Sequence, residues 1–204
     1  GRLMPDEGKI EWCKRITTGY LDQYTTLTKG KTIREVLREA FQHMYDLEAE
    51  MNEMYEKMGD CTEEEMNQYL EDTGEIQSEL ESSGFYELDS KIEEVANGLG
   101  LGEIGLDHDV SNLSGGQRSK VLLTKLLLAK PMILILDEPT NFLDEEQVNW
   151  LRMYLENYEN AFLLVSHDVS FLNSVINVIY HMEDGTLTRY SGNYDSFMQM
   201  YELK

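Results

Sequence analysis

Two short motifs, one helix length apart, constrain this chain more than any other feature. Leu113-Ser114-Gly115-Gly116-Gln117 is followed, after that interval, by the apolar run 132–136 and then by Asp137-Glu138-Pro139-Thr140-Asn141. A serine before two glycines predicts a helix start whose uncovered backbone N–H groups and helix dipole can hold a phosphate. The apolar run predicts a buried strand that ends in two acids. Alone, the first motif is also compatible with an ordinary serine-capped helix. Together the motifs predict half of a site for a nucleoside triphosphate.

The order of these motifs resembles that of the ATP-binding-cassette (ABC) ATPases, in which the first is the signature sequence and the second is Walker B. Gln23 stands in the Q-loop place, Asn141-Phe142-Leu143-Asp144 in the D-loop place, and Ser166-His167-Asp168 follows the apolar run 162–165. The sequence contains no phosphate-binding loop of the form GxxxxGK[ST] before Gln23, because Gly30-Lys31-Thr32 follows that residue and lacks the first glycine. Residues 1–8 resemble the segment beyond that loop's helix, so we expect a fragment without Walker A.

The resemblance implies ATP and Mg²⁺ as ligands. Phosphoryl transfer to water requires neutralised γ-phosphate charge and an aligned water. Asp137 is suited to bind magnesium, and Gln23 to link the metal to the helical region. Glu138 is suited to orient the attacking water, and the alternative for this residue is an ordinary surface acid. His167 is a candidate γ-phosphate contact, and a buried structural histidine is its alternative. The candidate catalytic residues are Glu138 and His167, the metal ligands Asp137 and Gln23, and the ATP-binding residues Gln23, Ser114, Gly115, Gly116, Gln117 and Asp144.

Alternating helices and strands are expected after the signature motif: helix 117–128, strand 132–136, helix 145–158 capped by Asp144, and strand 162–165. Short strands are also expected at 9–12 and 16–21. The two later strands are apolar throughout, so each is expected to be buried on both faces, in a parallel sheet sandwiched by helices. Ligands of such sheets lie at the carboxyl ends of strands, where Asp137, Glu138 and His167 fall. The expected fold is α/β, a partial ABC-type core with a helical subdomain.

The helical subdomain, 32–112, is expected to carry a helical-hairpin arm at about 41–84. Thr32 opens a helical stretch that Gly59-Asp60 breaks, and Thr62 with Glu65 predicts a capping-box start for a second helix. At the usual helical rise, residues 41–58 would project roughly 27 Å. A methionine-rich stripe on the first helix is expected to form the seam of the hairpin, with a ligand surface as the alternative. The remaining expected units are 1–31 with the Q-loop, 113–192 with the signature and Walker B motifs, and 193–204 as the start of a linker.

The net charge of −22 is concentrated in the expected arm, where Lys57 is the only lysine or arginine between Phe41 and Phe85. A solvated acidic face explains this excess more simply than a recognition surface, and bulk charge excludes non-specific nucleic-acid binding. Cys13 and Cys61 form no metal-spaced cluster, which predicts a reducing compartment. The apolar runs are strand-sized and no signal peptide is seen, so a cytoplasmic protein without membrane insertion is expected.

The arm, the D-loop sequence, Arg118-Ser119-Lys120 and Tyr190-Ser191-Gly192-Asn193-Tyr194 resemble the ABC-F class. The resemblance implies two cassettes that meet head to tail, so that each signature motif acts on the ATP held by the other cassette and this chain alone completes no site. It also implies the ribosome or tRNA as a partner of the intact protein. The alternative left open is the nucleotide-binding subunit of an ABC membrane transporter.

Overall fold

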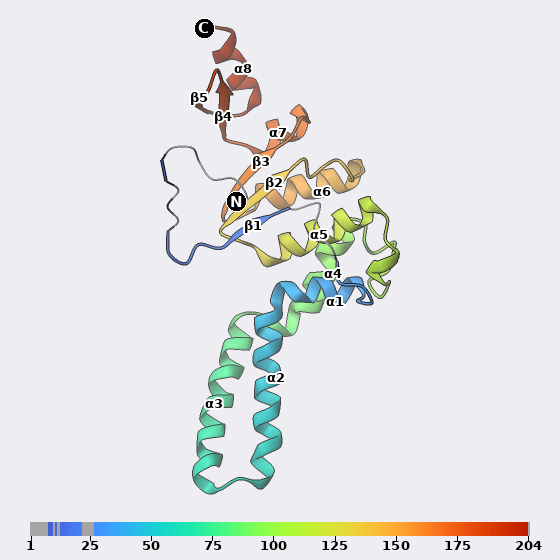
Figure 1. The fold of residues 1–204 in the computed structure, drawn as a ribbon, viewed down its shortest axis with the longest axis vertical. Coiled ribbons are helices and arrows are strands. Elements are labelled where there is room, and N and C mark those ends of the chain that lie inside the picture. Colours follow the sequence, from blue (N-terminus) through green and yellow to red (C-terminus); the bar gives the residue numbers. More distant parts are fainter. Residues whose placement is uncertain (1–7, 10, 12, 22–26, 204) are drawn as a thin grey trace.

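The computed structural model describes residues 8–9, 11, 13–21 and 27–203. A parallel sheet holds β1 (Thr18–Tyr20), β2 (Ile133–Asp137) and β3 (Ala161–Val165) in the order β1-β2-β3. The expected strand at 16–21 is therefore confirmed in part. Lys9 and Glu11 lie outside any strand, and Ile10 and Trp12 lie outside the described residues. The predicted α/β class, with a parallel sheet and a helical subdomain, is confirmed (Figure 1).

Three helices follow the signature motif and the two later strands: α5 (Gly115–Ala129), α6 (Glu145–Glu156) and α7 (Val169–Val175). Their apolar faces join β2 in the main core, because Leu134 and Leu136 of β2 are fully buried together with Leu127 of α5 and Leu151 of α6. Helices α5 and α6 and strands β2 and β3 agree with the sequence expectation to within a few residues, whereas α7 was not among the predicted elements. The core thus fixes the carboxyl end of β2, where Asp137 and Glu138 lie, relative to the signature helix α5.

The prediction that β3 is buried on both faces is wrong. Leu163 and Val165 are each 52% exposed. They line an open groove of about 970 Å³, which β3 shares with β4 (Val178–Glu183) and α8 (Tyr194–Glu202). An apolar run shows that a strand can be covered on both faces, but another layer must be present to cover it.

A hairpin near the C-terminal end was not among the predicted elements. Strand β4 pairs in antiparallel fashion with β5 (Thr186–Ser191) across the turn Asp184-Gly185, where both residues have positive φ. Two such residues are typical of a type I′ hairpin turn. Helix α8 begins after Asn193, whose side chain accepts a hydrogen bond from the Ser196 amide, and its Phe197 is buried against the Tyr190 ring.

The helical subdomain follows the expected plan, with a two-helix arm that projects away from the sheet (Figure 1). The arm consists of α2 (Gln42–Lys57) and α3 (Glu63–Ser82), and the capping box of Thr62 and Glu65 is present as predicted. Gly74 does not interrupt α3. The other helical elements of the subdomain are α1 (Ile33–Arg38), η1 (Glu39–Phe41), η2 (Met58–Asp60), η3 (Phe85–Glu87), α4 (Leu88–Gly98) and η4 (Val110–Asn112).

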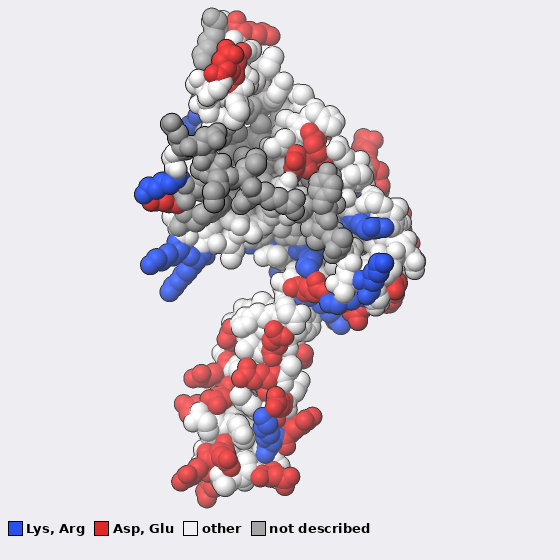
Figure 2. Space-filling view, in the orientation of Figure 1, with Lys and Arg blue, Asp and Glu red and all other residues white. Residues whose placement is uncertain are grey.

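The arm has a small core of its own at its root. Met51, Leu80, Phe85 and Leu88 form this cluster, and Phe41 packs against both it and the main core. The methionine stripe faces inward, because Met44, Met51, Met54 and Met58 are all buried or half-buried, which confirms its prediction as the seam. Acidic side chains are spread over the visible face of the arm, among uncharged ones (Figure 2). The predicted solvated acidic face is therefore seen on the outside of the hairpin.

Candidate functional site

The signature motif forms an exposed helix start. Ser114 is the N-cap of α5, where its hydroxyl accepts a hydrogen bond from the Gln117 amide at 3.3 Å and the Gln117 side chain accepts one from the Ser114 amide at 2.8 Å. Ser114 and Gly115 are exposed. A Cβ at Gly115 would meet nothing within 4 Å, whereas one at Gly116 would lie 3.4 Å from Phe142. The first turn of a helix has unsatisfied N–H groups and positive dipole charge, so this surface suits a phosphate.

The Walker B acids lie at the carboxyl end of β2, as predicted. Asp137 is the last residue of the strand and is exposed. Glu138 follows with φ of 46°, in the left-handed region that residues with a Cβ rarely occupy. Its backbone N–H donates to the Val165 carbonyl at 2.8 Å. Pairing with β3 therefore holds Glu138 in a strained conformation, and such strain is concentrated at functional sites.

The structure brings Glu138 and His167 together. His167 Nδ1 lies 2.9 Å from Glu138 Oε2, which is ion-pair distance. The two atoms lack hydrogen-bond geometry, and Oε2 is buried without a hydrogen-bond partner among the described residues. The His167 side chain is 79% exposed and that of Glu138 24%. The buried-histidine alternative for His167 is therefore wrong, and a carboxylate with one oxygen buried beside an imidazole nitrogen is no ordinary surface acid.

A small cavity of about 10 Å³ links Glu138 to the signature helix. Its wall includes Leu21 from the end of β1, Ser119 and Lys120 from α5, and Phe142 from the D-loop. This volume is near the minimum that holds a single water. Leu21 leads toward Gln23, which lies outside the described residues, so the structure places no Q-loop side chain. The cavity shows that the signature helix, the D-loop and Glu138 are packed together within one chain.

Asp144 caps α6, with its carboxylate accepting from the Gln147 amide at 3.0 Å. The buried Gln147 side chain in turn accepts from Lys120 Nζ at 2.7 Å. A chain of contacts therefore runs from the signature helix through Gln147 to the D-loop. Sequence reasoning assigned no site role to Lys120. Lys120 is the sixth residue of α5, and nothing in the local sequence indicates its partner, because Gln147 comes close only when α6 packs beside α5.

The side chains at the end of β2 and the start of α5 fit ATP and magnesium, because phosphate oxygens and waters can complete the coordination of the metal. No group of three or more His, Cys, Asp or Glu side chains able to hold a metal occurs in the described part of the chain. Magnesium usually binds through one or two carboxylates, waters and substrate phosphates, so the exposed Asp137 suffices as its carboxylate. The exposed start of α5 suits a phosphate, and the partly exposed carboxylate of Glu138 suits a water.

Comparison with known proteins agrees with this geometry. The profile of the family described as "ABC transporter" matches residues 1–141. The chain is 59% identical, over its whole length and 39% of the relative, to an uncharacterized ABC transporter ATP-binding protein, YfmM, of Bacillus subtilis. It is 37% identical, over 96% of the chain and 34% of the relative, to the energy-dependent translational throttle protein EttA of Mycobacterium tuberculosis. The chain thus spans about two fifths or less of these relatives.

Solved structures show the same fold at low identity. The ATP-binding subunit of an ABC transporter superposes with a TM-score of 0.59 at 17% identity, covering 92% of this chain and 63% of that one. The archaeal ribosome recycling factor aABCE1, solved in complex with the ribosomal stalk protein aP1, gives a TM-score of 0.60 at 23% identity, covering 98% and 32%. Among the described residues, none of the helices has the length and apolar character needed to cross a membrane. Both the matched profile and the motif geometry lead to one assignment: the chain belongs to the ABC transporter family as an ABC ATP-binding domain.

Proposed function

We propose that this chain is the ATP-binding and ATP-hydrolysing domain of an ABC-F-type, ribosome-associated translation factor in the cytoplasm. The observation that carries the proposal is the two-helix arm, α2 and α3, inserted between the Q-loop segment and the signature motif. The 37% identity to a protein named a translational throttle supports it. The arm has its own core at its root, so it is built to project from the ATPase rather than to cover the sheet.

The residues at the end of β2 and His167 after β3 have separate roles in ATP hydrolysis. When bound, ATP would supply the phosphoryl group, and magnesium held by Asp137 would neutralise its charge. Glu138 orients the attacking water through the exposed part of its carboxylate, and that carboxylate accepts the water's proton. His167, 2.9 Å away, steadies that carboxylate and reaches the solvent-facing side where the γ-phosphate would lie. Asp137 faces solvent beside them as the magnesium ligand.

The signature residues act on a different nucleotide. Ser114 and Gly115 are exposed at the start of α5, so they are available to a second cassette that presents its own ATP. Gln117 completes the capping box that fixes this turn, and Asp144 fixes the adjacent D-loop by capping α6. A head-to-tail pair of cassettes is therefore the proposed working unit. This chain by itself is expected to show no ATP turnover above background.

The hydrolytic role is tested in the full-length protein with Glu138→Gln, which keeps the size and the backbone contact to Val165 of the native residue. ATP turnover should fall by about two to four orders of magnitude, the usual contribution of a positioned general base, while ATP stays bound. Glu145→Gln, which neutralises an exposed acid at the start of α6, is the matched control. Unchanged turnover in Glu138→Gln would remove this residue from the mechanism.

The partner is tested by co-sedimentation of the full-length Glu138→Gln protein with ribosomes in the presence of ATP. The proposed function predicts co-sedimentation, and deletion of residues 42–84 should weaken it while nucleotide binding is retained. The alternative, a nucleotide-binding subunit of a membrane transporter, has the name of the Bacillus subtilis relative in its favour. It predicts co-purification with a membrane permease and no dependence of ribosome binding on the arm.

A further inference from the structure

A shared ion bridge joins the root of the arm to the signature helix. The Glu39 carboxylate, in η1, accepts hydrogen bonds from Lys31 Nζ and from Lys125 Nζ, each at 2.5 Å. Lys125 lies on α5, the helix that Ser114 caps. The side chains of Glu39 and Lys125 are only 27% and 33% exposed. Burial acts to raise the pKa of Glu39, but the hydrogen bonds from Lys125 and Lys31 outweigh it and hold this pKa below its usual value.

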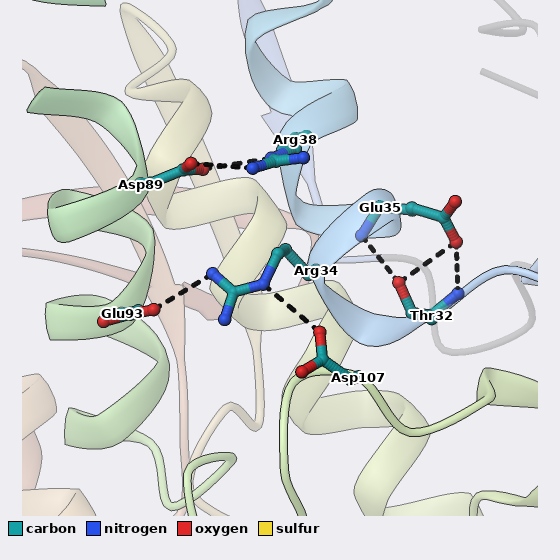
Figure 3. A network of polar contacts seen from close by, with 7 residues as sticks. All are labelled: Thr32, Arg34, Glu35, Arg38, Asp89, Glu93 and Asp107. Carbon is teal, nitrogen blue, oxygen red and sulfur yellow. Dashed lines mark hydrogen bonds and ion pairs between the residues drawn. The ribbon is translucent and has the colours of Figure 1, made fainter. Parts of the chain in front are cut away.

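The other end of α1 is fastened to the loop that leads into the signature motif. The Ile33 and Arg34 amides donate to the carbonyls of His108 and Leu106 at 3.0 and 2.8 Å. The Arg34 guanidinium also pairs with Asp107, at 3.4 Å (Figure 3). This loop continues through η4 directly to Ser114. Helix α1 is therefore held to the signature unit at its first turn by backbone bonds, and just beyond its last turn by Glu39.

The arm is in turn fixed to α1. Arg38 makes two hydrogen bonds to Asp89 of α4, at 3.0 and 2.7 Å (Figure 3), and its guanidinium lies 5.7 Å from the centre of the Tyr45 ring on α2. Phe41 belongs to both the arm core and the main core. A displacement of α2 must therefore move η1, and with it the carboxylate of Glu39.

We propose that Glu39 is a positioning residue that couples the arm to the signature helix, so that binding of a partner to the arm changes the placement of Ser114. The partner's identity rests on the proposed function, whereas the coupling rests on the contacts of Glu39. Energetic coupling between distant sites needs a chain of packed contacts that both sites can bias. Here the chain is short: α2, η1, the Glu39–Lys125 pair, α5 and Ser114. The carboxylate of Glu39 is shared by the ammonium groups of Lys31 and Lys125. Removing its charge leaves these two like charges to repel each other, and Lys125 carries that repulsion to α5.

The coupling is tested first without any partner, by measuring a distance. In the full-length protein, with Cys13, Cys61 and any further native cysteines replaced by serine, spin labels are placed at Glu64 near the arm tip and at Asn149 on α6; both positions are exposed. Double electron–electron resonance spectroscopy then gives the distribution of distances between the two labels. Glu39→Gln should broaden this distribution about twofold, as expected for a domain released to collective hinge motion. Lys125→Met should have the same effect, and Lys125→Arg, which keeps the charge, should restore the native width.

A second carboxylate on the arm provides the matched control. Glu50 is exposed on α2 and lies outside the bridge, so Glu50→Gln should leave the distribution at its native width. A native width in Glu39→Gln would overturn the inference, as would equal broadening in Glu50→Gln. Nucleotide binding by the same variants shows that they are folded.

The second measurement is ATP turnover by the full-length protein with and without ribosomes. Glu39→Gln should lower the stimulation by ribosomes about fivefold, the low end of coupling between sites, with Glu50→Gln unaffected. If Glu39→Gln broadened the distance distribution but left ribosome-stimulated ATP turnover unchanged, the bridge would hold the arm in place without coupling it to the signature helix, and the inference would be overturned. If ribosomes neither bind nor stimulate the unmodified protein, the proposed function fails, and the distance distributions alone decide whether Glu39 positions the arm.

Discussion

Replacing Gly98 by alanine tests how the helical subdomain is held to the ATPase core. Gly98 is the last residue of α4 and faces α6. A Cβ built there would lie 2.1 Å from Cε2 and 2.3 Å from Nε1 of Trp150. The indole is half-buried and stacked on Tyr154 with ring centres 5.4 Å apart, so a shift of the ring must disturb that stacking. Either α4 must separate from α6, or the ring must leave a packed position.

The expected cost follows from two opposing terms. Overpacking in a filled core costs about 1–3 kcal/mol. Alanine gains up to about 1 kcal/mol over glycine in a helix interior, and less at the final residue. The net loss for Gly98→Ala is therefore about 1–2 kcal/mol. For a protein of this size, that corresponds to a fall of roughly 3–6 °C in the midpoint of thermal unfolding.

The same substitution elsewhere gives a matched control of opposite sign. Gly74 lies within α3, and a Cβ there would meet nothing within 4 Å. Gly74→Ala should therefore stabilise the protein by about 0.5–1 kcal/mol. Thermal unfolding followed by circular dichroism measures both variants, and Trp150→Leu combined with Gly98→Ala should cost less than the sum of the single changes. If Gly98→Ala were as stable as Gly74→Ala, the packing of α4 on α6 would not be as tight as described.

Three further outcomes can be measured on the same protein. Ser114→Ala removes the cap of α5 and should lower unfolding free energy by about 1 kcal/mol, whereas Ser114→Asp should retain the cap; equal loss in both would contradict the capping role. Tyr154→Phe removes the hydrogen bond from the tyrosine hydroxyl to the Leu127 carbonyl, 2.8 Å long, and should cost about 1 kcal/mol in chemical denaturation. The pKa of Glu39 lies below its ordinary value of 4.5. Its stabilisation is therefore complete above about pH 4.5 and is lost as the pH falls through the folded-state pKa. Stability of Glu39→Gln should depend less steeply on pH in that acidic range, and an identical slope would show that the bridge contributes nothing.

Local signals in the sequence predicted most of the elements that position the candidate site. The capping boxes at Thr32, Thr62, Ser114 and Asp144 place helix starts within a few residues, because side-chain and backbone groups three residues apart satisfy each other without tertiary help. The apolar run before Asp137 likewise predicts β2. Gly74 lies within α3 without interrupting it, because one glycine costs a helix only about 1 kcal/mol and the packing of the arm outweighs that cost.

The prediction failed where the outcome depends on a second layer. The exposed face of β3 and the β4–β5 hairpin were missed because the covering of a strand, and the pairing of short mixed strands, depend on neighbours distant in sequence. The 2.9 Å approach of His167 to Glu138 was expected only in outline, from both residues following parallel strands. The left-handed backbone of Glu138 carries no signature in its own sequence.

The sequence by itself determined which residues could bear the chemistry and where helices begin, because motifs and caps act over a few residues. It also determined that the arm is an acidic hairpin with an inward methionine seam, since periodicity fixes which side chains share a face. Only the tertiary structure decided that Glu39 reaches Lys125 and that the start of α1 is bonded to the loop before Ser114. Those contacts join residues far apart in the chain, and packing alone brings them within hydrogen-bond distance.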